Sequence, residues 1–508
     1  MARTSDAAQD IEQINPAVET DPLLGGAART GAISPTSISD EYDEYYTDQN
    51  YTKLALEDAI DIFKLGVPLF ISMVSWVGMR TTDTALLGHV SGEALSASAL
   101  SDLWTMTTGP LIQGRILGIF CGQAVGAGNP KLAGIWLQVS LYVLSMLSIV
   151  VFISWNVTEY VWIAFGEDEA IAKDAGYYAR VLSFAIPGTL MLSQATQFFS
   201  SQQIMRPEVV ASSVALVLNL VLGLFLVLGI PFPNFAGYGF AACPWVTSSV
   251  TYLQVLIVGV IFCYIQGLHR PCWGGWSWKE ITNERVKSFS GLYFPSALSL
   301  ASDFWRVAAI GGVAAKIGEE EVGVFNTSYR IMWITLILIG AIARAAGIKM
   351  SLRLGNGDPM GAKRAGYVGI FVSVIILFFL SGAVVWKIRE FAMIFTDDDV
   401  FLNLFEEMRW PFVATLFFMN LSVAIEKVPI SLGRTTAVFW AGFAGSWLGQ
   451  VPGVIFFTVY WRNDLVGLYT GMAVGYILCT VLYSFITLTS DWKKYSDQAI
   501  ERSEAKED

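Results

Sequence analysis

The sequence GAGNPKLA at residues 126–133 is matched 229 positions later by GNGDPMGA at residues 355–362. The glycines at the first and third positions, the proline and the final alanine are identical, and an asparagine is paired with an aspartate. Pro68 and Pro295 are separated by a similar interval of 227 residues. Matches at nearly one offset indicate an internal duplication. The chain is therefore predicted to consist of two similar halves.

The composition is that of a membrane protein. Of the 508 residues, 54% are hydrophobic and 15% are charged, whereas soluble proteins carry about 25% charged residues. Apolar runs of at least 18 residues, long enough to cross a hydrocarbon layer of about 30 Å, recur along the chain. We predict an all-α polytopic membrane protein with twelve transmembrane helices in two pseudo-symmetric six-helix bundles. The predicted spans are 62–86, 95–122, 134–155, 177–199, 208–230, 238–265, 287–315, 322–347, 366–386, 410–431, 436–460 and 465–489.

The net charge of −11 belongs to the ends of the chain. Residues 1–60 hold twelve acids and three bases, and residues 491–508 hold six acids and four bases, so the body between them is neutral. This distribution gives no reason to expect nucleic acid as a partner. The predicted segments are a disordered acidic cytoplasmic tail at 1–58, a first lobe with helices 1–6 at 59–268, a cytoplasmic connector at 269–286, a second lobe with helices 7–12 at 287–490, and a cytoplasmic tail at 491–508.

The predicted orientation follows from the loops. Basic residues such as Lys131, Arg206 and Lys349 fall in one set of loops, and acidic runs such as 167–169 and 319–321 fall in the other. By the positive-inside rule, both termini are expected to be cytoplasmic. The sequence ETDPLL at residues 19–24 fits an acidic dileucine sorting signal. It favours a vacuolar or lysosomal membrane, with the plasma membrane as the alternative.

Several motifs resemble one transporter family. CGQAVGAG at 121–128, PSAL at 295–298 followed by Asp303-Phe304-Trp305, LRLGNGDP at 352–359 and GLYTG at 467–471 are similar to signatures of the multidrug and toxic compound extrusion (MATE) family. The resemblance covers about residues 60–490. It implies two lobes that form a V and cation-coupled antiport of organic solutes. The residues expected to have motif or structural roles are Gly122, Gln123, Gly126, Gly128, Pro68, Pro295, Gly355 and Gly357.

Acidic residues inside predicted spans are candidates for ion coupling, because a buried charge is costly unless it is paired, hydrated or functional. Asp83 resembles the first-span aspartate that bacterial members use for proton or sodium coupling, and Asp303 falls where eukaryotic-type members carry a glutamate. Glu426 is a second acid in the second half. The competing interpretations are an ion pair of Asp83 with Arg80 and one of Asp303 with Arg306, one helical turn away.

Three arginines inside the spans, Arg306, Arg115 and Arg344, have two interpretations. A guanidinium suits a carboxylate or phosphate, so they could bind an anionic substrate; alternatively, each neutralises a nearby acid. Trp305, Trp76 and Tyr329 are candidate walls of the substrate cavity, because aromatic faces attract organic cations.

The leading hypothesis is an antiporter that exports or sequesters organic solutes in exchange for H⁺, or Na⁺, by alternating access. The alternatives are an exporter of citrate-like carboxylates and a flippase for lipid-linked saccharides, both of the same fold. An enzyme is not expected, because the chain has two histidines and neither HExxH nor GxSxG. No cofactor or metal is expected. The expected partners are a small organic substrate and the lipid bilayer, and the protein is expected to be a monomer.

Overall fold

The computed structural model describes residues 48–232, 234–393 and 398–504. The predicted sorting signal and most of the predicted N-terminal tail lie outside these residues. The chain divides into a unit that ends at Leu56 and a second unit, Glu57–Asp508. The helix Asp48–Val90 begins in the first unit and continues into the second.

The described residues form helices and no strands, and all twelve predicted spans coincide with helical segments. In the first half these are α3 (Asp48–Val90), α4 (Gly92–Thr108) with η2 (Gly109–Ile112) and α5 (Leu117–Gly126), α6 (Pro130–Asn156), α8 (Glu169–Ser183) with α9 (Ile186–Ser201), α10 (Arg206–Leu226), and η3 (Gly239–Ala242) with α11 (Cys243–Leu256) and η4 (Ile257–Ile265). In the second half they are α12 (Asn283–Ile317), α13 (Glu319–Gly355), α14 (Pro359–Trp386), α17 (Arg409–Ser431), α18 (Thr435–Phe443) with η7 (Ala444–Gln450), α19 (Val451–Phe456) and η8 (Phe457–Trp461), and α20 (Leu465–Leu488).

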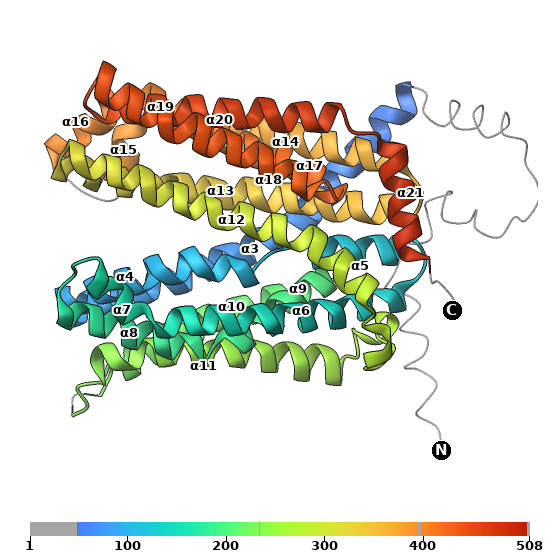
Figure 1. Ribbon diagram of the computed structural model, residues 1–508, viewed down its shortest axis with the longest axis horizontal. Coiled ribbons are helices and arrows are strands. Elements are labelled where there is room, and N and C mark those ends of the chain that lie inside the picture. Colours follow the sequence, from blue (N-terminus) through green and yellow to red (C-terminus); the bar gives the residue numbers. More distant parts are fainter. Residues whose placement is uncertain (1–47, 233, 394–397, 505–508) are drawn as a thin grey trace, which may run out of the picture. The chain divides into compact units, whose positions relative to one another are not determined.

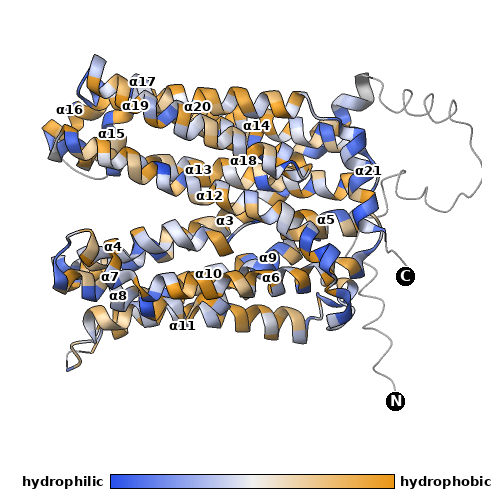
Figure 2. Ribbon diagram, in the orientation of Figure 1, coloured by the Kyte–Doolittle hydropathy of each residue, from blue (hydrophilic) through white to orange (hydrophobic). Residues whose placement is uncertain are grey.

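Short helices join or cover the ends of these spans. They are α7 (Thr158–Ala164), η5 (Arg270–Cys272), η6 (Trp278–Glu280), α15 (Ile388–Met393), α16 (Asp399–Glu407) and α21 (Trp492–Ser503). Within the second unit, the helices from α4 to α11 form one bundle and the helices from α13 to α20 form the other (Figure 1). Hydrophobic residues run along the helices, and hydrophilic residues gather at their ends (Figure 2). We call the end of the bundles that carries α21 the α21 end.

By length and composition, nine helical segments of the described chain could each cross a membrane. The predicted second and fourth spans are not among them, because each is divided into two shorter helices. The predicted span at 287–315 is also not among them, since Asp303 and Arg306 make α12 more polar. The difference therefore reflects broken and charged helices rather than missing ones.

α3 and α12 each pass from one bundle to the other. Ile62 and Leu69, in the earlier part of α3, pack with residues of α13, whereas Leu86 packs in the first bundle. In the same way, Tyr293 of α12 packs in the first bundle and Ile310 packs in the second. This exchange gives the two bundles a shared core near the α21 end.

Two predicted tails are in part helical. α3 begins at Asp48, so the prediction of a disordered tail as far as residue 58 was wrong for its last part. The alanines, leucine and glutamate near Leu56 favour a helix, and Asp58 is 1% exposed because it is paired with basic residues of α13 and α14. The 491–508 segment contains α21, whose Trp492 and Ala499 are buried.

Candidate functional site

The duplicated motifs meet where α5 crosses α13. Gly126 touches the backbone of Leu352, and Gly355 touches the backbone of Gln123, so closely that a methyl group at either glycine would overlap a carbonyl oxygen. A Cβ at Gly122 would lie 2.9 Å from the side chain of Ser351. These motif residues hold the two halves together near the α21 end.

Gly128 and Gly357 occupy matching turns after this crossing. Their φ angles of +76° and +74° belong to the left-handed region, which favours glycine. The sequence match at this point therefore has a structural cause in both halves.

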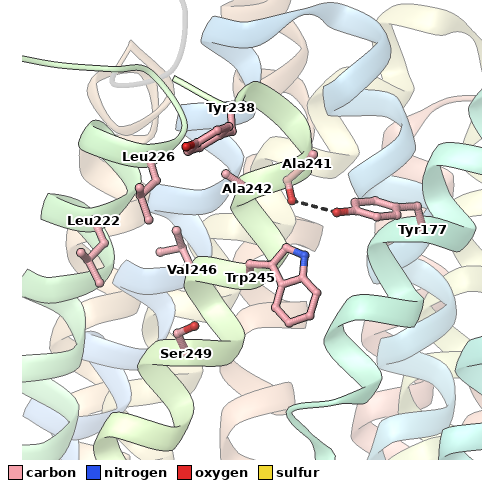
Figure 3. Close-up of a pocket in the computed structure, with 9 residues that line it drawn as sticks. All are labelled: Tyr177, Leu222, Leu226, Tyr238, Ala241, Ala242, Trp245, Val246 and Ser249. Atoms are coloured by element: carbon pink, nitrogen blue, oxygen red, sulfur yellow. Dashed lines mark hydrogen bonds between the residues drawn. The ribbon is translucent and has the colours of Figure 1, made fainter. Parts of the chain in front are cut away.

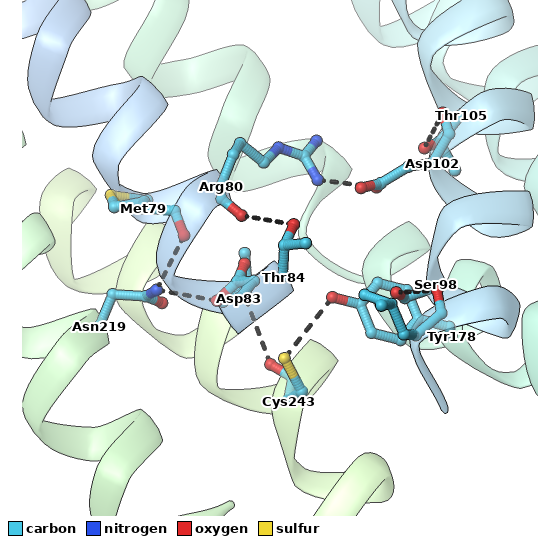
Figure 4. Close-up of polar contacts among 12 residues, drawn as sticks. Met79, Arg80, Asp83, Thr84, Ser98, Asp102, Thr105, Tyr178, Asn219 and Cys243 are labelled. Carbon is cyan, nitrogen blue, oxygen red and sulfur yellow. Dashed lines mark hydrogen bonds and ion pairs between the residues drawn. The ribbon is translucent and has the colours of Figure 1, made fainter. Parts of the chain in front are cut away.

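Asp83 lies inside the first bundle and is 4% exposed. Its Oδ1 accepts a hydrogen bond from Asn219 Nδ2 at 2.8 Å, and its Oδ2 accepts one from Thr247 Oγ1 at 2.8 Å. The amide of Asn219 also approaches the Met79 carbonyl oxygen at 3.4 Å, as Figure 4 shows. Both carboxylate oxygens are therefore held by neutral donors from α10 and α11.

Arg80 does not form the predicted alternative ion pair with Asp83. Its guanidinium is paired with Asp102 of α4 at 2.9 Å, also visible in Figure 4. Arg80 lies one helical turn from Asp83 but points toward a different helix. Of the two acids Asp83 and Asp102, Asp102 is paired with Arg80, whereas Asp83 makes no ion pair with the residues that the structure describes.

Asp303 forms the ion pair with Arg306 that the sequence offered as an alternative. One carboxylate oxygen lies 3.2 Å from Arg306, whose side chain is 7% exposed, whereas the side chain of Asp303 is 51% exposed. Arg306 also donates to Ser446 at 3.0 Å and to Tyr476 at 3.2 Å. The arginine is thus fixed within the second bundle, and the carboxylate remains accessible on its other side.

Glu426 and Lys427 of α17 are both half-buried. Each is near enough to Asp303 for their charges to interact. The two predicted acids of the second half therefore lie within electrostatic range of each other and of Arg306.

The three predicted aromatic residues have different neighbours. Trp305 is 44% exposed and its Nε1 donates to the Thr107 carbonyl oxygen of α4 at 3.3 Å, so it joins the two bundles. Tyr329 stacks on Phe325 with ring centroids 6.0 Å apart. Trp76 packs beside Arg80, whose guanidinium is 6.0 Å from the ring centroid.

The remaining arginines belong to the region where the bundles meet. Arg344 of α13 pairs with Glu208 of α10 at 2.9 Å. Arg115 lies in the non-helical break between η2 and α5 and is exposed. Tyr293 of α12 holds this break, because its hydroxyl accepts from Gly114 N–H at 3.0 Å and donates to the Leu111 carbonyl oxygen at 3.0 Å.

Pro68 and Pro295 are the matched prolines of the two halves, for which motif or structural roles are expected. Each lies inside a helix that is assigned without interruption, α3 and α12 respectively. These are the two helices that pass between the bundles.

Two surface cavities are apolar. One of about 330 Å³ lies between α8, α10 and α11 (Figure 3), and one of about 470 Å³ lies beside α14. No charged residue lines either one. The first is lined by Tyr177, Leu222, Leu226, Tyr238, Ala241, Ala242, Trp245, Val246 and Ser249. We therefore place the candidate site at the charged clusters and not at these cavities.

The comparisons with known proteins identify the family. The MatE family model matches twice, at residues 68–225 and 295–455, once in each half. The chain belongs to the MatE family. Protein DETOXIFICATION 29 of Arabidopsis thaliana is 22% identical over 87% of this chain and 87% of its own length, and Protein DETOXIFICATION 17 of the same plant is 27% identical over 87% of this chain and 92% of its own.

The fold agrees with this assignment. The crystal structure of the eukaryotic MATE transporter AtDTX14 superposes with a TM-score of 0.81 at 20% identity, and covers 89% of this chain and all of that one. This protein is therefore a MATE transporter with the twelve-helix, two-lobe fold. Members of this family are transporters rather than enzymes. Among the described residues, no three or more His, Cys, Asp and Glu side chains cluster as metal ligands would.

In this MATE transporter, sequence reasoning missed several residues of the clusters. Asn219 and Thr247 had a weak signal, since each is a polar residue within a predicted span. Glu208 falls at the start of the predicted fifth span, where an acid gives little signal of a partner. The relation between Arg115 and Arg344 had the clearest signal, because the motif offset of 229 residues also separates these two arginines.

Proposed function

We propose that this MATE transporter is a secondary antiporter that moves organic solutes out of the cytoplasm in exchange for protons. The two bundles would alternate in exposing a shared site, as repeat-built transporters do. Proton binding in each bundle would change how the bundles pack.

The observation that carries this proposal is one acid cluster in each bundle, with opposite exposure. Asp83 is enclosed, and both of its carboxylate oxygens accept hydrogen bonds from neutral donors. A proton on Asp83 would turn one acceptor oxygen into a donor, so at least one contact would have to rearrange. The Oδ1 of Asn219 is buried and has no partner among the described residues, so it could accept that proton's hydrogen bond after the amide turns. Proton binding is thereby linked to the packing of α3 against α10.

The second cluster would carry substrate exchange. Asp303 keeps one side open while Arg306 is held by Ser446 and Tyr476. An incoming cationic group or a proton would compete with Arg306 for this carboxylate. Release of a proton from this cluster as substrate arrives would couple the two fluxes.

Transport by purified protein in proteoliposomes tests the proposal. We expect a pH gradient, inside acidic, to drive accumulation of ethidium, and we expect Asp83→Asn and Asp303→Asn each to reduce the initial rate about tenfold or more. Asp174→Asn, an exposed aspartate of α8, is the matched control and should transport normally. Absence of gradient-driven flux would overturn the antiporter proposal. Flux driven by a sodium gradient alone would replace the proton with sodium.

The location and assembly are also proposals. We propose that the α21 end and both termini face the cytoplasm, because the loops with basic residues are expected on that side. The ETDPLL sequence supports a vacuolar or lysosomal membrane rather than the plasma membrane. We propose a monomer, with the substrate and the surrounding lipid as its partners. Fluorescence of tagged protein in a cell of the native organism would identify the membrane.

A further inference from the structure

Arg115 and Arg344 are equivalent residues of the two halves. They are separated by 229 residues, the interval between the duplicated glycine motifs. Arg115 lies seven residues before Gly122, and Arg344 lies seven residues before Ser351; Gly122 and Ser351 touch where α5 crosses α13. Because seven residues are about two helical turns, Arg344 lies on the face of α13 that meets α5. The duplication therefore places two arginines just beyond the crossing of the bundles.

The negative charge beside these arginines is not duplicated. Arg344 binds Glu208 with both terminal nitrogens, at 2.9 and 3.0 Å to separate carboxylate oxygens. The side chains of Arg344 and Glu208 are 14% and 13% exposed. At the same offset of 229, the counterpart of Glu208 is Ala437. The two equivalent arginines therefore share a single carboxylate, that of Glu208.

Arg115 is the arginine left without a carboxylate. It is exposed, and it forms no ion pair or hydrogen bond with any residue that the structure describes. Its charge lies within interaction range of Arg344 and Glu208. The adjacent backbone is fixed, since Tyr293 bonds to Leu111 and Gly114 across the break. The Arg115 backbone is therefore anchored near a like charge, and no residue in the described part of the chain pairs with its guanidinium.

We propose that Arg115, Arg344 and Glu208 bind one singly charged oxyanion, the carboxylate group of a soluble organic substrate. Two guanidinium groups and one carboxylate leave a net charge of +1, which a single carboxylate neutralises. Guanidinium groups present planar pairs of donors that match carboxylate oxygens. This inference names the substrate class of the transporter proposed above and rests on that function.

The position of the cluster suits a transported ligand. Arg344 and Glu208 come from opposite bundles, and Arg115 lies just before α5, the helix of the first bundle that crosses α13. A carboxylate between the arginines would compete with Glu208 for Arg344. Its binding would therefore weaken an ion pair that connects the bundles. A phosphodiester of a lipid headgroup has the same charge and donor requirements, so the test must separate the two sources.

Protection of arginine from phenylglyoxal tests the binding without any ion gradient. The full-length protein in phosphatidylcholine nanodiscs would be modified in the presence of succinate or its neutral diamide, succinamide, and each arginine would be quantified by mass spectrometry. We expect succinate, and not succinamide, to slow modification of Arg115 about tenfold. Arg180, an exposed arginine paired with Glu159, is the internal control. Equal modification of Arg115 with and without succinate would overturn the proposal.

Two charge variants separate a binding site from a simple clamp between bundles. Glu208→Gln removes the competing carboxylate, so we expect tighter protection of Arg115 by succinate, by about tenfold in concentration. Arg344→Gln removes a donor group and should weaken protection by a similar factor. If both variants weaken protection alike, the Arg344–Glu208 ion pair only connects the bundles, and the proposed binding site is wrong. Protection of Arg115 by phosphatidic acid in the nanodisc, with no further effect of succinate, would assign the site to lipid and overturn the soluble-substrate form.

The outcome is distinguishable from failure of the proposed transport function. Succinate protection without gradient-driven flux would retain the site and reject the antiporter. Gradient-driven ethidium flux without protection by succinate would retain the antiporter and reject this site.

Discussion

Gly126 of α5 lies directly against the backbone carbonyl of Leu352 of α13. The reciprocal contact, Gly355 against the carbonyl of Gln123, is related to it by the duplication. The backbone of one helix can approach the other this closely only where the facing residue has no side chain, as glycine does. The glycines of the repeated motif therefore allow α5 and α13 of the two halves to pack in direct backbone contact.

Gly126→Ala is expected to open this contact. Its methyl group would overlap the Leu352 carbonyl oxygen, and overpacking of this kind costs about 1–3 kcal/mol. We expect a lower melting temperature in detergent and a greater distance between spin labels on α5 and α13. Gly118→Ala, on the same helix, is the control, because no atom lies within 4 Å of its added Cβ. Unchanged label distances in Gly126→Ala would contradict the role of this glycine.

Tyr293→Phe is expected to loosen the break in the second span. The variant leaves the Gly114 N–H and the Leu111 carbonyl oxygen without their shared partner, and an unsatisfied buried group costs about 1–3 kcal/mol. We expect faster hydrogen exchange at residues 111–116 and slower ethidium transport. Tyr142→Phe, at an exposed tyrosine with no hydrogen bond among the described residues, should change neither. Normal exchange at the break would show that Tyr293 does not hold it.

Asp58→Asn is expected to destabilise the protein strongly. Asp58 is 1% exposed. Its carboxylate forms ion pairs with Arg353, Arg364 and Lys349 at 2.5, 2.8 and 3.1 Å. Removing one partner of a buried ion cluster costs about 3–5 kcal/mol, because the remaining charges stay buried without compensation.

Asp61→Asn is the matched control for Asp58→Asn. Asp61 also pairs with Lys349, at 2.7 Å, but its side chain is 47% exposed, so its loss should cost about 0–1 kcal/mol. Thermal unfolding of both variants in the same detergent compares them. Equal losses of stability would mean that burial does not determine the strength of this cluster.

The number and order of the spans followed from the sequence, because long apolar runs and the duplicated motifs are local signals. The non-helical breaks within individual spans could not be predicted from the sequence. The predicted 95–122 span divides near Gly114 because Tyr293, far along the chain, replaces the missing helical hydrogen bonds there. The Asp58 cluster was missed for the same reason, since its partners come from α13 and α14 and its own neighbours read as a polar tail. Contacts between distant segments decided both features.

The candidate site was predictable only in part. Asp303 and Arg306 are one helical turn apart, so their ion pair could be proposed from spacing alone, and it is present. Asp83 could be singled out, but its partners Asn219 and Thr247 could not, because neutral residues in apolar runs carry little signal. The pairing of Arg344 with Glu208 depends on how the bundles meet. The charged residues could be recognised in the sequence, but their partners depend on how the helices pack.

The last prediction concerns α21, which contacts both copies of the repeated motif. Ser496 donates to the Leu354 carbonyl oxygen at 3.0 Å, and the Ser503 carbonyl oxygen accepts from Asn129 Nδ2 at 3.3 Å. Trp492 is 8% exposed and packs in the same cluster as Leu354. α21 therefore bridges the two halves beside the crossing of α5 and α13.

Deletion of residues 491–508 should make the crossing open more often. A reporter cysteine at Ser351, which is 2% exposed, would be introduced in a protein whose five native cysteines are replaced. We expect a membrane-permeant maleimide to label it several-fold faster in the truncated protein, because loss of α21 removes apolar contacts and two hydrogen bonds that favour closure. A chain that ends at Ser503 retains α21 and should label like the full-length protein. If both truncations label at the full-length rate, α21 does not hold the halves together.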